Sequence, residues 1–149
     1  MERTRWIVVG TDFSAAADRA LQHAAALASE LRAAVAFTHA YEDAPGACCH
    51  SDLAEGLTAR LEEAASRVRA RFPAVKVECF VRRGAPWEKL ANVACELGAD
   101  MIVVGASGER GCANRRFVGS VVSRVTVVSD RAVLVVPEED EGISVSSSA

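Results

Sequence analysis

The sequence predicts an α/β protein with a single domain, built on an open, mostly parallel sheet of five strands with helices on both faces. The 149 residues fit one domain, and half of them are hydrophobic, which is enough for a substantial core. Short apolar runs alternate with longer segments whose apolar residues recur at helical spacing. Strands separated by helices lie parallel in one sheet, and continuous apolar runs are typical of parallel strands that are buried on both faces.

The chain begins with a strand, a helix and a second strand. Residues 5–9 form a short apolar run that stops at Gly10, which predicts a buried strand. Ser14 is a suitable N-cap for the next segment, whose apolar residues fall on one helical face. Residues 35–39 predict the second strand. It ends at His39, for which we expect a structural role because its neighbours are apolar.

The middle of the chain continues with a loop, a long helix and a third strand. Residues 41–50 contain a proline and a glycine and predict the loop. Residues 53–72 carry the clearest helical pattern of the chain, and Pro73 ends it. Residues 75–81 alternate with a period of two, as a strand with one wetter face does.

The last third holds a helix, two strands and one ambiguous segment. Pro86 suits the first turn of a helix, and Gly98 suits its C-terminal cap. Residues 101–104 predict a fourth, buried strand, and residues 132–136 predict a fifth strand that Pro137 closes. Residues 121–129 are ambiguous, because their β-branched residues favour a strand whereas their place between two strands favours a helix.

Composition and charge exclude several classes of protein. We expect a domain over residues 1–137, followed by an acidic and Ser-rich tail, 138–149, that is disordered. The net charge of −3 and the lack of clustered Lys and Arg exclude a nucleic-acid partner. No apolar stretch of ~18 residues escapes a charge, so no membrane partner is expected. The first apolar run is too short for the core of a signal peptide, which predicts a cytoplasmic protein.

The cysteines predict neither disulfides nor a metal site. The sequence has five cysteines, an odd number, and contains no CxxC motif. In a reducing cytosol they are expected to be free thiols. Cys48 and Cys49 next to His50 lack the spaced ligand pairs of a zinc site, so no metal ligand is assigned.

Two loops are candidates for a ligand site, because open α/β sheets bind ligands beyond the carboxyl ends of their strands. The first is the turn at residues 10–14, which contains Asp12. This carboxylate can accept a hydrogen bond from a base or a ribose, or it can simply mark the start of a helix. The second is the segment 105–120, with four glycines in sixteen positions. Its final Gly119–Ser120 pair would open a helix whose free N–H groups favour a phosphate, although glycines can also serve only as turns.

These features resemble the universal stress protein family over about residues 5–137. The resemblance rests on Asp12 after the first strand, the Gly84–Ala85–Pro86 turn, the Gly105-x-x-Gly108 … Gly119–Ser120 loop and the final Val133–Pro137 segment. It implies a Rossmann-like, adenine nucleotide alpha hydrolase-like fold with strand order 3-2-1-4-5, a homodimer, and membership of either an ATP-binding or a non-binding branch. The ATP-binding branch matches the glycine loop better.

The ATP-binding branch implies a cofactor site for ATP, with or without Mg²⁺, at these positions: Thr11, Asp12, Ala40, Gly105, Gly108, Gly119, Ser120 and Val121. Thr11 and Asp12 would lie near the adenine, and Ala40 would meet the base through its backbone. Gly105 and Gly108 would line the ribose and phosphates. The phosphate oxygens would be held by Gly119, Ser120 and Val121. Between Gly108 and Gly119 the loop has ten residues, one more than the ATP-binding pattern. The extra residue can bulge harmlessly or move Gly108 away from the phosphates.

In the implied strand order the last strand lies at an edge of the sheet. An exposed apolar edge at residues 133–136 favours antiparallel pairing with a second copy, which predicts a homodimer. Together these features predict an adenine-nucleotide-binding regulatory protein of the stress response. The alternatives are a dimeric stress protein that binds no nucleotide and acts through protein partners, and a weak ATPase. No catalytic residue is assigned, because no general base is evident near the glycine loop.

Overall fold

The computed structural model describes residues 3–43, 46, 50–106 and 119–137. Five strands form one parallel sheet in the order β3-β2-β1-β4-β5, which confirms the predicted topology. The strands are β1 (Trp6–Gly10), β2 (Ala34–Tyr41), β3 (Val77–Arg83), β4 (Met101–Gly105) and β5 (Ala132–Val136). The helices are α1 (Ala15–Leu31), α2 (His50–Arg71), α3 (Pro86–Leu97) and α4 (Ser120–Val128).

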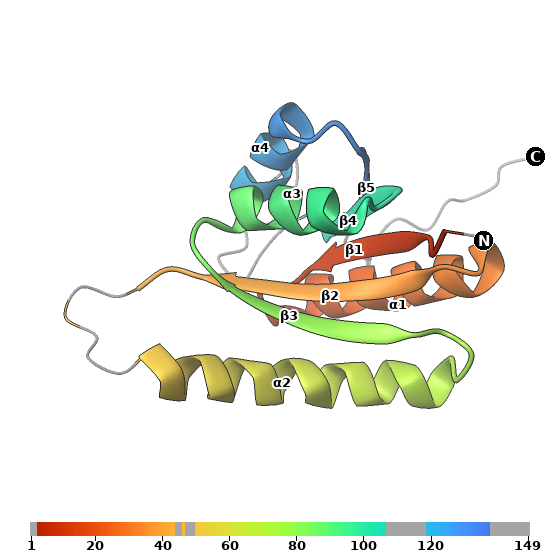
Figure 1. Cartoon of the computed structure of the whole chain (residues 1–149), viewed down its shortest axis with the longest axis horizontal. Coiled ribbons are helices and arrows are strands. Elements are labelled where there is room, and N and C mark those ends of the chain that lie inside the picture. Colours follow the sequence, from red (N-terminus) through yellow and green to blue (C-terminus); the bar gives the residue numbers. More distant parts are fainter. Residues whose placement is uncertain (1–2, 44–45, 47–49, 107–118, 138–149) are drawn as a thin grey trace, which may run out of the picture.

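The helices cover both faces of the sheet, with α1 and α2 on one side and α3 and α4 on the other (Figure 1). Successive strand residues point to opposite faces, so Val9 belongs to the core that includes residues of α1 and α2, while its neighbour Val8 belongs to the core that includes residues of α3 and α4. Both side chains are fully buried. The continuous apolar runs in the sequence therefore reflect a sheet that has a core on each side.

The helix ends follow the predicted caps. The Ser14 hydroxyl accepts a hydrogen bond from the backbone N–H of Ala17 at 3.2 Å, so Ser14 is the N-cap of α1. Pro86 occupies the first turn of α3, and Gly98 ends that helix in the left-handed conformation with φ 59°. These caps fix where each helix begins or ends relative to the sheet.

The ambiguous segment is a helix. Residues Ser120–Val128 form α4, because Val122 and Val125 lie three positions apart and are both buried against α3 and the sheet. This burial outweighs the strand preference of the β-branched residues. The third strand also starts later than residue 75, because the Val75 N–H donates to the Phe72 carbonyl in a turn.

None of the helices in the described ranges is long and apolar enough to cross a bilayer. Cys79 and Cys95 are free thiols, as predicted for these two residues. Cys48, Cys49 and the expected tail at residues 138–149 lie outside the part of the chain that the structure describes.

Candidate functional site

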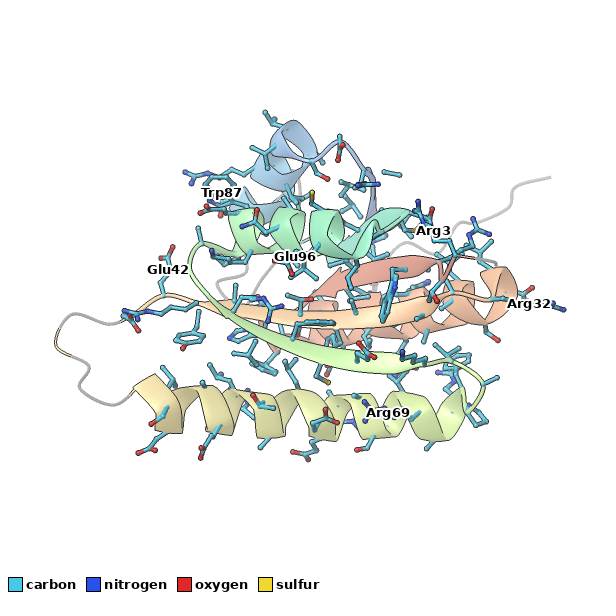
Figure 2. All side chains as sticks on the ribbon, in the orientation of Figure 1. Arg3, Arg32, Glu42, Arg69, Trp87 and Glu96 are labelled. Carbon is cyan, nitrogen blue, oxygen red and sulfur yellow. The ribbon has the colours of Figure 1, made fainter. Side chains whose placement is uncertain are left out.

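The carboxyl ends of β1 and β4 lie side by side in the sheet. The two strands are parallel neighbours, with Val9 opposite Val103. The first turn of α1 passes directly over the end of β4, since a Cβ added to Gly105 would lie 3.0 Å from the Ala16 carbonyl oxygen. Glu42 and Trp87 mark this edge of the molecule in Figure 2, opposite the edge marked by Arg3 and Arg32.

The turn after β1 is built from hydrogen bonds between side chains and the backbone. The Thr11 hydroxyl accepts from the Phe13 N–H at 2.9 Å. One carboxylate oxygen of Asp12 accepts from the Ser14 N–H at 3.0 Å. This bond fits the local, helix-start interpretation of Asp12, and it also fixes where the carboxylate lies. Asp12 is half-buried, so part of it remains accessible to solvent or to a ligand.

Phe13 has a left-handed backbone conformation with φ 65°. For a residue with a bulky side chain such a conformation costs ~1–3 kcal/mol and persists only where the surroundings enforce it. Two side chains do so here. The His39 ring lies 4.6 Å from the Phe13 ring, centroid to centroid, and the Arg60 guanidinium carbon lies 4.0 Å from the Phe13 ring centroid.

The beginning of α4 is tied to the end of β4 through Ala106. The Gly119 N–H donates to the Ala106 carbonyl at 3.0 Å, and the Ala106 N–H donates to the Val136 carbonyl at 2.9 Å. The first bond within α4 runs from the Ser123 N–H to the Gly119 carbonyl. The N–H groups of Ser120 and Val121 therefore have no acceptor inside the helix, and they favour an anion together with the helix dipole.

The structure brings most of the predicted site residues to this edge. Thr11 and Asp12 lie in the β1 turn, and Ala40 lies one residue before the end of β2, paired with Arg82 of β3. Gly105 is the last residue of β4. The remaining described members, Gly119, Ser120 and Val121, span the N-cap and first turn of α4. Gly108 lies outside the described residues.

Gly105 has a packing reason as well as a possible binding reason. A side chain there would press on the backbone of Ala16, so the absence of a side chain is needed for α1 to cover the sheet. Gly119 is different, because an added Cβ would meet the Ala106 oxygen at 3.5 Å, an ordinary contact. The pair distinguishes a glycine that packing requires from one that packing does not.

Sequence reasoning missed the cluster of Phe13, His39 and Arg60 beside the site. His39 was expected to be structural, and Arg60 lies on a distant helix with no motif around it. The signal that the sequence offered was the imidazole of His39 at the end of β2, close to the turn after β1. Only the register of β1 against β2, with Gly10 opposite Thr38, shows that the two meet.

The largest pKa shift among the described groups lies away from this edge. Burial and the nearby Glu62 carboxylate raise the pKa of the Cys79 thiol to about 12. Arg69 donates to Glu62 at 2.8 Å and lowers the pKa of that carboxyl. Arg69 also donates to the Val77 carbonyl, so it holds α2 against β3 (Figure 2). This cluster is structural, since a thiol that stays protonated is a poor nucleophile.

A depression lies at the opposite end of the strands, where they begin. It is an open cavity of about 270 Å³ whose lining includes Thr4, Arg32 and Lys76. The strands begin here, so the cavity is separate from the carboxyl ends of β1 and β4.

The model of the universal stress protein family matches residues 4–137, which is most of the chain. The chain belongs to the universal stress protein family. The resemblance found in the sequence is thereby confirmed at the level of the family. No curated protein sequence is significantly similar to the chain.

Solved universal stress proteins share the fold. One in complex with cAMP is 30% identical, with a TM-score of 0.73, and the alignment covers 91% of this chain and 98% of that one. One from Archaeoglobus fulgidus in complex with dAMP is 24% identical, with a TM-score of 0.65 and coverage of 91% and 98%. One from Lactobacillus plantarum is also 24% identical, with a TM-score of 0.65 and coverage of 91% and 99%. Some proteins with this fold therefore carry an adenine nucleotide.

Proposed function

We propose that this universal stress protein is a regulatory protein of the stress response that binds an adenine nucleotide, with ATP as the ligand. The observation that carries the proposal is a chain of contacts along the carboxyl edge. The first turn of α1 touches Gly105, the next residue, Ala106, binds Gly119, and Gly119 caps α4. A ligand at this edge can meet the β1 turn and the positive end of α4 together. The relative in complex with cAMP supports an adenine nucleotide.

The beginning of α4 suits the phosphates. The N–H groups of Ser120 and Val121 lack helical acceptors, and the Ser120 hydroxyl is exposed beside them. In the structure the Gly119 N–H already donates to Ala106, so Gly119 would contact a phosphate only if that bond broke. We therefore assign the phosphate mainly to Ser120 and Val121. Gly105 and Gly108 would line the ribose and phosphates, and Mg²⁺ would accompany a triphosphate.

The β1 turn and β2 suit the base. Thr11 and Asp12 are half-buried in the turn, and Asp12 would accept a hydrogen bond from the adenine or its ribose. Ala40, which is half-buried near the end of β2, would offer its backbone to the base. Each of these residues binds or orients the nucleotide. No proton transfer is assigned to them, and a weak ATPase is the alternative function.

The two outer strands of the sheet, β3 and β5, differ in how exposed they are, and this difference supports a homodimer through β5. At the β3 edge, the Arg69 side chain from α2 donates to the Val77 carbonyl, which blocks pairing there. At the β5 edge, Leu134 is 37% exposed, and Val127 of the neighbouring helix α4 is 83% exposed. We propose that the 133–136 edge pairs with a second copy, and that the dimer works in the cytoplasm.

Calorimetric titration with ATP and Mg²⁺ tests nucleotide binding. We expect the wild-type protein to bind and Ser120→Ala to bind about tenfold more weakly, because a hydrogen bond to a charged group contributes ~1.5–3 kcal/mol and ~1.4 kcal/mol is tenfold. Ser123→Ala is the matched control, since it removes the same hydroxyl one turn further along α4. Equal affinities for the wild type and both variants would remove Ser120 from the site, and no heat from the wild type would refute nucleotide binding.

A further inference from the structure

Both backbone groups of Thr11 are held by β2. The Thr11 N–H donates to the Thr38 carbonyl at 2.9 Å. The Thr11 carbonyl lies 2.7 Å from Nδ1 of the next residue in β2, His39. A carbonyl oxygen can only accept, so His39 Nδ1 carries the proton and donates it. The contact therefore selects one tautomer of the ring.

The same ring also holds the residue on the other side of Asp12. Phe13 follows Asp12, and its ring packs against the His39 ring at 4.6 Å with the planes tilted by 45°. Arg60 of α2 lies over the Phe13 ring at 4.0 Å. Phe13 is thus enclosed by side chains from β2 and α2 in its left-handed conformation.

We infer that His39 is a positioning residue for the nucleotide site: it fixes Thr11 by a hydrogen bond and Phe13 by ring contact, and so sets the place of Asp12 between them. The inference rests on the proposed function, because the purpose of this placement is to present Asp12 to an adenine nucleotide. His39 itself need not touch the ligand. Its effect reaches the ligand through the turn, whose Asp12 carboxylate is already aimed by the Ser14 N–H.

Two substitutions separate the hydrogen bond from the ring contact. His39→Phe keeps an aromatic ring beside Phe13 and removes the donor to Thr11. His39→Asn removes the ring and keeps an N–H donor at the position of Nδ1. If the hydrogen bond positions Asp12, the Asn variant will keep more ATP affinity than the Phe variant. A role in packing alone predicts the reverse order.

The affinities are measured by calorimetry with ATP and Mg²⁺ on the full chain. We expect His39→Phe to bind about tenfold more weakly than the wild type, because the half-buried Thr11 carbonyl loses its donor, and His39→Asn to stay within about threefold. Wild-type affinity in His39→Phe, or a larger loss in His39→Asn than in His39→Phe, would overturn the inference. Nitrogen NMR of the histidine ring provides a separate readout, in which a proton on Nε2 instead of Nδ1 would also contradict it.

Hydrogen exchange without nucleotide separates this inference from the proposed function. The Phe13 and Ser14 N–H groups donate within the turn and report its order, whereas the Ala17 N–H reports the cap of α1. We expect His39→Phe to speed exchange at Phe13 and Ser14 at least severalfold and to leave Ala17 unchanged. Unchanged exchange at all three would show that His39 does not hold the turn. If the wild type binds no ATP but His39→Phe still exchanges faster at Phe13 and Ser14, the nucleotide role is refuted. The positioning of the turn by His39 is then established without it.

Discussion

The contact between Gly105 and the first turn of α1 predicts a measurable loss of stability in Gly105→Ala. The new Cβ would lie 3.0 Å from the Ala16 carbonyl oxygen and 3.1 Å from both the carbonyl carbon and the Cβ of Ala16. These are tighter than ordinary contacts, and two of the three atoms belong to the backbone, so α1 must shift as a unit. Overpacking of this kind costs ~1–3 kcal/mol.

The loss of glycine partly offsets this cost. Replacing glycine by alanine reduces the entropy of the unfolded chain and contributes about 0.4–1 kcal/mol of stability where the backbone allows alanine. The φ of Gly105 is not positive, so this gain applies. The net expectation is a decrease of about 1–2 kcal/mol in the free energy of unfolding, or roughly 2–8 °C in Tm.

Urea denaturation followed by circular dichroism measures this difference. Gly119→Ala is the matched control, since its added Cβ meets the Ala106 oxygen at 3.5 Å and its φ of −56° suits alanine. We expect the control to stay within about 0.5 kcal/mol of the wild type. A Gly105→Ala variant as stable as the control would show that α1 does not press on the end of β4, and the geometry of the shared edge would need revision.

Three further predictions test other parts of the molecule. Ser14→Ala should lower the free energy of unfolding by about 1 kcal/mol in urea denaturation, because α1 loses its N-cap, and an unchanged midpoint would argue against that cap. Cys79 should react with iodoacetamide at pH 8 far more slowly than the exposed Cys95, because its pKa of about 12 keeps the thiol protonated, and equal rates in peptide mass spectrometry would contradict that burial. Leu134→Arg should convert the proposed dimer to a monomer in analytical ultracentrifugation, whereas Leu53→Arg, which changes an exposed leucine on α2, should not. A dimer that survives Leu134→Arg would place the interface elsewhere.

Much of the fold could be predicted because its signals are local. Buried parallel strands are continuous apolar runs, and caps such as Ser14 and Gly98 act within one turn of their helix. The segment at 121–129 could not be assigned, because its helical state depends on burial of Val122 and Val125 against α3 and the sheet, which no local pattern contains. The first residues of β3 were misplaced for a related reason, since a turn bond to Phe72 takes the Val75 N–H.

The loops of the candidate site could be predicted from the sequence, but the tertiary contacts that hold those loops in place could not. The positions of Asp12 and Gly119 follow from the general rule that ligands bind at the carboxyl ends of strands. The pairing of Thr11 with His39 depends on the register between β1 and β2, and the packing of Gly105 depends on the path of α1. Both are tertiary facts. They also change the interpretation of Gly105, whose missing side chain serves the packing of α1 whether or not a ligand binds.

The most direct test is an NMR titration of the protein with ATP that follows backbone amides at the carboxyl ends and at the amino ends of the strands. The central claim is that one ligand touches the β1 turn and the beginning of α4 together. It predicts that the amides of Asp12, Ser120 and Val121 shift with a single dissociation constant, while Lys76 at the amino edge stays unchanged. Shifts confined to only one of the two segments, or centred on the cavity beside Lys76, would contradict the claim.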